Sequence, residues 1–215
     1  SKKLLSLINK FYDITYLIRP CKIFNDDILE SNVYSAINKS NQLEPDTDWM
    51  NLFKEKDALI KKDIYNAFNN SDLNEYTFAH KFIEKIPENS NVFVGNSLMI
   101  RAFNIFSEKN QKHIRFFSNR GVSGIDGNLS SALGIASKSK ENNFLVIGDQ
   151  SFMHDIGALQ ILAENNINLT IFIINNYGGA IFDHLPISEK IDSKIFKKFI
   201  RNQHNKSFQS IIESY

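Results

Sequence analysis

Residues 144–151 read Phe-Leu-Val-Ile-Gly-Asp-Gln-Ser, and residues 169–179 read Leu-Thr-Ile-Phe-Ile-Ile-Asn-Asn-Tyr-Gly-Gly. Each string begins with an apolar run and becomes polar at its end, which is typical of a buried strand in a parallel sheet. Twenty-five residues separate Asp149 from Asn175, enough for a crossover helix. The two strings therefore predict neighbouring parallel strands joined by a helix.

The polar residues that follow these strands form a candidate ligand site. Open α/β sheets bind ligands at the carboxyl ends of their strands, where Asp149, Asn175 and Asn176 are expected to meet. Oxygen ligands without thiolates or a histidine pair favour a hard cation such as Mg²⁺, with Mn²⁺ as an alternative. Mg²⁺ keeps few protein ligands and binds phosphate oxygens and water, so the pattern predicts a metal-held diphosphate. The pair Gly178-Gly179 is expected to let the backbone approach the ligand closely and to free a carbonyl for the metal.

Each of these residues also has a purely structural interpretation. Asp149 could cap a helix predicted over 155–164 or hold a turn, and both asparagines could be left-handed turn residues before the glycine pair. The spacing of the two halves favours the ligand site over an accidental combination.

The alternation of strands and helices extends outward from this centre. The predicted strands cover 91–94, 114–117, 144–148 and 169–174, and the predicted helices cover 76–86, 97–106, 128–138 and 155–164. This order predicts an α/β fold with a doubly wound parallel sheet. After Ile181 the sequence is helical and polar, with no obvious last strand.

The amino-terminal part of the chain lacks this alternation. Residues 1–72 are interpreted as a helical linker or the remnant of a preceding central domain, with a helix over 49–68. Residues 73–215 are interpreted as the ligand-binding domain, incomplete at its C-terminal end.

The composition excludes several broad classes. With 42% apolar residues and a net charge of +1, the chain has no bulk attraction to nucleic acid or to a membrane surface. It has no apolar run of 18 residues, so no transmembrane helix is predicted. The single Cys21 excludes an internal disulfide and fits a reducing compartment, here the cytoplasm.

Two further segments carry candidate binding residues. The loop 118–127 has three glycines and precedes a helix, so its amides could hold an anion. Arg120 in this loop can bind a carboxylate in bidentate fashion, or form a surface salt bridge. Ser97 and Arg101 share one face at the start of a helix, where Ser97 could also be a simple N-cap.

Several strings together resemble a known family. Gly148-Asp149 and Asn175-Asn176 resemble the thiamine-diphosphate signature. The strings 94–98 with Arg101, 118–127 and 175–186 closely resemble the MenD family, the 2-succinyl-5-enolpyruvyl-6-hydroxy-3-cyclohexene-1-carboxylate synthases of menaquinone biosynthesis. The resemblance is strong over about 75–186 and weak before that.

The resemblance implies a role for each matching residue. Asp149, the Asn176 side chain and the Gly178 carbonyl would hold Mg²⁺, which would hold the cofactor diphosphate. Ser151 and the amides near Gly148 would contact phosphate. Around the rest of the cofactor, the implied contacts are Gly124, Ile125 as the residue that bends the cofactor, and an apolar wall of Ile181, Phe182 and Leu185.

The resemblance also implies a reaction and partners. Thiamine diphosphate and Mg²⁺ would support decarboxylation of 2-oxoglutarate and addition of the succinyl-semialdehyde enamine to isochorismate. Ser97 and Arg101 would bind one substrate carboxylate, and Arg120 a second. The family's pyrimidine-binding domain, normally supplied by the partner subunit of a dimer or tetramer, has no counterpart in 1–70. The chain is therefore expected to be a fragment that is inactive alone.

Two other functions stay open from the sequence. One is another thiamine-diphosphate enzyme, similar to acetolactate synthases or 2-oxoacid decarboxylases. The other is a non-catalytic domain that keeps the fold and binds a cofactor or an assembly partner.

Overall fold

The computed structural model describes residues 47–107 and 112–215. These residues fall into two units whose boundary lies between Tyr65 and Asn66. Helix α3, Thr47–Asn69, crosses this boundary and confirms the helix predicted over 49–68. The rest of the predicted linker, 1–46, lies outside the described residues, and the domain division near residue 72 stays a prediction. Across the described ranges, we find no helix with the length and apolar character needed to cross a bilayer.

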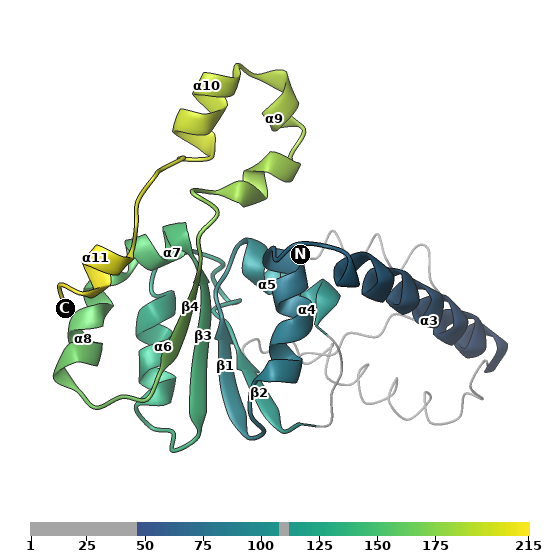
Figure 1. The fold of residues 1–215 in the computed structure, drawn as a ribbon, viewed down its shortest axis with the longest axis horizontal. Helices are drawn as coiled ribbons and strands as arrows, with labels where there is room; N and C mark the ends of the chain where they lie inside the picture. The colour runs from purple at the N-terminus through teal and green to yellow at the C-terminus, as the bar shows by residue number, and fades with distance from the viewer. Residues whose placement is uncertain (1–46, 108–111) are drawn as a thin grey trace, which may run out of the picture. The chain divides into compact units, whose positions relative to one another are not determined.

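A four-stranded parallel sheet forms the centre of the second unit. Its strands are β1 (Ser90–Val94), β2 (Ile114–Phe117), β3 (Asn142–Gly148) and β4 (Thr170–Ile174). They lie in the order β2-β1-β3-β4, and every neighbouring pair is parallel (Figure 1). The predicted strands and the α/β fold are therefore confirmed. The change of strand order on either side of β1 makes the sheet doubly wound.

Helices cover both faces of the sheet. On one face lie α4 (Glu75–Lys85) and α5 (Leu98–Phe106), and on the other lie α6 (Asn128–Ala136) and α8 (Leu159–Glu164) (Figure 1). Two apolar clusters fill the layers. One contains Phe82 and Phe103 with strand residues such as Val92, and the other contains Leu129 and Leu133.

The helix predicted over 155–164 differs from the observed structure. Helix α7, Asp149–His154, begins immediately after β3, and a 3₁₀ turn over Ile156–Ala158 separates it from α8. Asp155 interrupts the helix because its carboxylate accepts hydrogen bonds from the backbone N–H and the hydroxyl of Ser130, at the start of α6. Asp155 thus caps a neighbouring helix rather than its own.

The chain after β4 is helical, as predicted. It contains a 3₁₀ helix (Ala180–His184), α9 (Ile187–Lys190), α10 (Ser193–Ile195), a short π-helix (Phe196–Ile200) and α11 (Gln209–Ile212). This segment leaves the sheet and then returns to it (Figure 1). Phe208 anchors the return because it is buried against Phe152 of α7, with ring centroids 5.5 Å apart.

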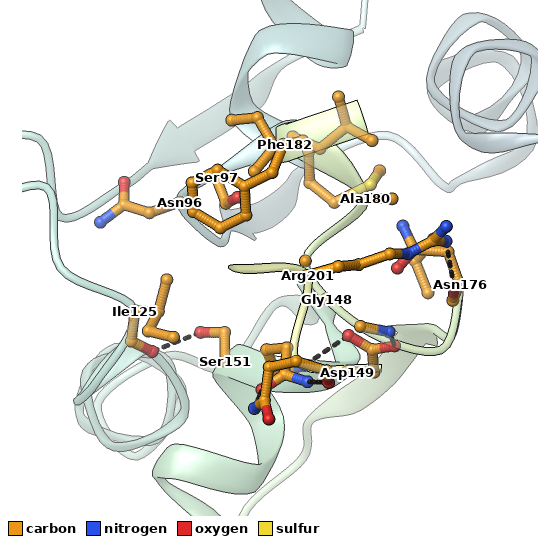
Figure 2. Close-up of a pocket in the computed structure, with 18 of the residues that line it drawn as sticks. Asn96, Ser97, Ile125, Gly148, Asp149, Ser151, Asn176, Ala180, Phe182 and Arg201 are labelled. Carbon is orange, nitrogen blue, oxygen red and sulfur yellow. Dashed lines mark hydrogen bonds between the residues drawn. The ribbon is translucent and has the colours of Figure 1, made fainter. Parts of the chain in front are cut away.

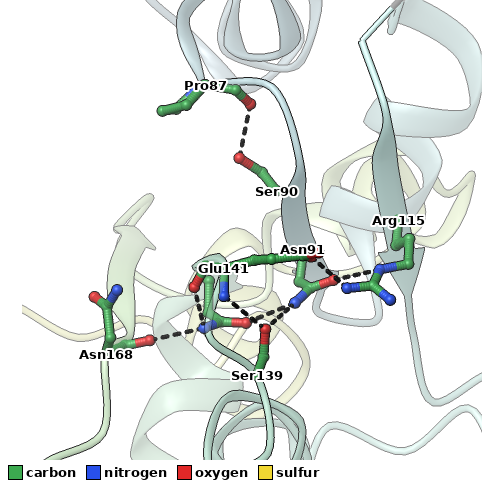
Figure 3. A network of polar contacts seen from close by, with 8 residues as sticks. Pro87, Ser90, Asn91, Arg115, Ser139, Glu141 and Asn168 are labelled. Carbon is green, nitrogen blue, oxygen red and sulfur yellow. Dashed lines mark hydrogen bonds and ion pairs between the residues drawn. The ribbon is translucent and has the colours of Figure 1, made fainter.

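The amino end of the sheet is closed by a polar network. Asn91 of β1 donates to Asn143 of β3 and to Ser139, both at 2.8 Å, and accepts from Nε of Arg115 in β2 (Figure 3). Arg115 also pairs with Glu141. Because the buried amides are satisfied only when the three strands are in register, the network favours this alignment.

Candidate functional site

The carboxyl ends of β3 and β4 bring the two polar strings together. Gly148 pairs with Ile174 in the strand register, so Asp149 and Asn175 follow from adjacent positions. Beside them lies a cavity of about 250 Å³ (Figure 2). Most of the predicted site residues line it: Ser97, Ile125, Gly148, Asp149, Ser151, Asn176, Gly178, Ile181 and Phe182.

Asp149 is buried and held in place by backbone amides. Its Oδ2 accepts from the N–H of Gly178 at 2.9 Å, and its Oδ1 accepts from the N–H of Gln150. His204 Nε2 lies 3.2 Å from the same Oδ2, without the alignment of a hydrogen bond. Because each carboxylate oxygen has two lone pairs, Asp149 keeps capacity to bind a cation.

Asn176 supplies an unused oxygen. Its Nδ2 donates to Glu75 at 2.8 Å, whereas its Oδ1 is buried and has no hydrogen-bond partner among the described residues. A buried acceptor without a partner costs free energy, and a bound cation would satisfy it. An anchored carboxylate and an unpaired amide oxygen, both hard oxygen donors, fit a divalent cation such as Mg²⁺.

The turn role that the sequence left open belongs to Asn175 and Tyr177. Asn175 Oδ1 accepts from the N–H of Tyr177 at 3.1 Å, and Tyr177 has a positive φ of 64°. Asn176 lies in the middle of that turn through its backbone, but its side chain bonds to Glu75 instead, so the two asparagine side chains have different functions.

The glycine pair lies close to other parts of the chain. A Cβ on Gly178 would lie 2.7 Å from the backbone oxygen of Arg201, and one on Gly179 would lie 2.9 Å from the Phe182 ring. The glycines therefore allow a close approach of the chain's own residues, and the predicted approach to a ligand stays a prediction. The Gly178 carbonyl accepts from the N–H of Ala180 at 2.9 Å, which leaves one lone pair.

The returning C-terminal segment holds this turn. The N–H of Gly179 donates to the Arg201 carbonyl at 2.6 Å, and the N–H of His204 donates to the Tyr177 carbonyl at 3.2 Å. Arg201 also donates through Nη2 to the Asn176 carbonyl at 3.1 Å and pairs through Nη1 with Asp183 at 2.9 Å. No motif in the sequence pointed to Arg201 or His204.

Asn96 joins the glycine-rich loop to the start of α5. It is 2% exposed, and its Nδ2 donates to the carbonyls of Asn119 and Gly124 at 2.9 and 2.6 Å. Its Oδ1 accepts from Arg120 at 3.2 Å. Sequence reasoning overlooked Asn96, although it stands within the Gly-Asn-Ser string that marked the helix start.

Ser97 occupies the N-cap position of α5, but within the described residues its side chain makes no capping hydrogen bond. Its φ is +70°, a strained value for a residue with a Cβ, and such strain often accompanies a binding site. Arg101 donates to the Ser97 carbonyl at 2.6 Å. Arg101 and Arg120 are both exposed and lie outside the cavity lining.

Ser151 is used within the chain. Its hydroxyl donates to the carbonyl of Ile125 and accepts from Asn128 at 3.0 Å. Since its only proton is already donated, Ser151 fixes the position of Ile125 on the cavity wall.

In Figure 2, Asp149 and Ser151 lie on one side of the cavity and Phe182 and Ser97 on the other. Gly124 and Leu185 lie outside the lining residues.

The sequence profile described as thiamine pyrophosphate enzyme, C-terminal TPP binding domain, matches residues 94–215. The chain belongs to this family. The recognition of the thiamine-diphosphate signature is thereby confirmed.

Named relatives show which thiamine-diphosphate enzymes this chain resembles. Two of them, from Desulfitobacterium hafniense and Bacillus velezensis, are named 2-succinyl-5-enolpyruvyl-6-hydroxy-3-cyclohexene-1-carboxylate synthase. The first is 36% identical over 158 residues, which is 74% of this chain. The second is 48% identical over 101 residues, which is 47% of this chain. A third, from Synechocystis, is 38% identical over 130 residues, 60% of this chain. The matched part spans 28%, 18% and 22% of these relatives. The resemblance to MenD is therefore confirmed for part of that enzyme.

Proposed function

We propose that this chain forms the diphosphate- and metal-binding part of a MenD-type synthase. One observation carries the proposal. An anchored carboxylate, Asp149, shares one cavity with Asn176, whose buried oxygen lacks a partner in the part of the chain that the structure describes. Asp149, Asn176 Oδ1 and the Gly178 carbonyl would hold Mg²⁺, which would hold thiamine diphosphate.

The remaining residues would orient the cofactor and its substrates. When bound, thiamine diphosphate supplies an electron sink for decarboxylation. Ile125, Ile181 and Phe182 would surround it with apolar side chains that exclude water. Further cofactor contacts would come from Gly148 with the amides beside it, Gly124 and Leu185. Ser151 would contribute through its hydrogen bond to the Ile125 carbonyl.

The arginines would bind the acidic substrates. Arg101 and Arg120 each donate to one described acceptor and have further N–H groups, which suit planar carboxylates. We assign 2-oxoglutarate to Ser97 and Arg101, and isochorismate to Arg120. The reaction would be decarboxylation of the first and addition of the remaining four-carbon unit to the second.

A partner domain is part of the proposal. The cavity of about 250 Å³ is below the roughly 300–1,000 Å³ typical of ligand pockets, which is consistent with a site shared with another domain. A pyrimidine-binding domain from a partner subunit would supply the rest, in a homodimer or homotetramer. The single Cys21 fits a cytoplasmic location.

Isothermal titration calorimetry with thiamine diphosphate and Mg²⁺ tests the binding proposal. The unaltered chain should bind, and EDTA should abolish binding because the diphosphate is held through the cation. Asp149→Ala should reduce the affinity at least 10-fold by removing the anchored ligand.

Asp72→Ala is the matched control because Asp72 is exposed and contacts its neighbours through its backbone carbonyl. It should bind like the unaltered chain. Equal affinities of Asp149→Ala and the unaltered chain, or no binding even with a pyrimidine-binding domain supplied, would overturn the proposal.

A further inference from the structure

The first turn of α4 is rigidly fixed beside the candidate metal site. Asn74 caps the helix by accepting from the N–H groups of Tyr76 and Thr77, and Thr77 accepts from the N–H of Asn74 in return. Ala79, Phe82 and Ile83 bury the following turns in the core. Glu75, at the first position of this helix, is therefore held in a defined place.

The Glu75 carboxylate makes a hydrogen bond to one of the proposed metal ligands. Its Oε1 accepts from Nδ2 of Asn176 at 2.8 Å, although 101 positions separate the two residues in the sequence. A carboxylate can only accept, so it selects the amide orientation in which the NH₂ group faces Glu75. With the opposite orientation, two acceptor oxygens would face each other.

This selection decides which atom of Asn176 faces the site. With Nδ2 committed to Glu75, Oδ1 is left over, and it is buried without a partner within 47–107 and 112–215. Carboxylates that hydrogen-bond a metal ligand commonly fix its orientation and increase its basicity.

We propose that Glu75 is the positioning residue that turns the Asn176 amide oxygen toward the divalent cation. This inference rests on the proposed function, because it assumes that the site binds a cation. It adds a residue outside the cavity lining and outside the thiamine-diphosphate signature.

The first test measures Mg²⁺ affinity directly, in the full 215-residue chain with thiamine diphosphate present, by titration calorimetry. Glu75→Ala should weaken Mg²⁺ binding about 10- to 100-fold. Glu84→Ala is the control, since Glu84 is an exposed carboxylate on the same helix. Far-UV circular dichroism and thermal melting without ligand establish that each variant is folded.

Moving the carboxylate from position 75 to position 176 tests whether Glu75 acts by orienting the side chain at 176 or only by packing. Asn176→Asp alone should bind Mg²⁺ poorly, because its carboxylate faces that of Glu75. Adding Glu75→Gln should recover at least 10-fold in affinity, since the new glutamine NH₂ donates to one aspartate oxygen and leaves the other for the cation. This reciprocal rescue keeps the test decisive if Glu75→Ala fails to fold.

The outcomes separate this inference from the proposed function. If the unaltered chain does not bind Mg²⁺ and thiamine diphosphate even with a pyrimidine-binding domain supplied, the proposed function fails and the inference fails with it. If the unaltered chain binds, and Glu75→Ala binds equally well or the exchange gives no recovery, the inference alone is overturned.

Discussion

At the scale of single residues, buried side chains with unusual hydrogen bonding decide the site. Asn96 satisfies two loop carbonyls and orients Arg120, yet nothing in its own sequence context distinguishes it from a turn asparagine. Asp149 and Asn176 were predicted because they follow apolar strands. Glu75 and Arg201 were not, since a helix-start glutamate and a loop arginine carry no such pattern.

Replacing Asn96 tests its contribution to the stability of the fold. Asn96→Ala leaves the carbonyls of Asn119 and Gly124 without donors, so we expect a loss of about 1–3 kcal/mol in unfolding free energy. Asn104→Ala, an exposed position in α5, should change stability little. Urea denaturation of both variants measures the difference, and matching midpoints would contradict the assignment.

Tyr76 gives a prediction for alkaline pH. Burial, and secondarily the Glu75 carboxylate, raise the pKa of Tyr76 above its ordinary value of about 10. Its hydroxyl lies 3.0 Å from His184 Nε2. Above pH of about 10 the unfolded chain releases this proton before the folded one, so stability should fall as pH rises toward the raised pKa.

Tyr76→Phe removes that contribution. The unfolding free energy of the variant should decline less steeply above pH of about 10 than that of the unaltered chain, measured by denaturation across an alkaline pH series. Tyr65→Phe, at an exposed position in α3, is the control. An identical pH slope for Tyr76→Phe and the unaltered chain would exclude the effect.

At the scale of elements, regular periodicity predicted the strands and most helices closely. The exception was the region after β3, where the sequence predicted one helix over 155–164 and the structure has α7, a 3₁₀ turn and α8. The break depends on Asp155 bonding to Ser130 of α6, a contact that no local pattern contains.

The turn after β4 depends on a second non-local contact. Gly178 has a φ of +139° and lies against the backbone of 201–203, so Gly178→Ala should cost more than about 1 kcal/mol and weaken binding of Mg²⁺ with thiamine diphosphate. Gly134→Ala, in the open interior of α6, should instead stabilise the fold by about 0.5–1 kcal/mol. Thermal melting and calorimetry measure both effects, and a neutral Gly178→Ala would refute the proposed close packing.

At the scale of the whole molecule, the proposed site is shared between domains. We expect the chain alone to show no 2-oxoglutarate decarboxylation. Adding a pyrimidine-binding domain from a MenD relative should restore carbon dioxide release, and isochorismate should convert that activity into product formation. Turnover by the isolated chain would contradict this division, and activity on pyruvate instead would indicate an acetolactate synthase-like enzyme.

The order of apolar runs and polar strand ends was enough to establish the parallel sheet and the meeting of Asp149 with Asn176. Both follow from the periodicity of apolar residues along the sequence and from the geometry that all parallel strands share. Which atoms are free to bind was settled by packing across the fold, where Glu75 engages the Asn176 amide and the returning segment 201–204 engages the glycine turn. Such contacts join positions far apart in the chain, and their hydrogen-bond directions exist only once the elements are in place.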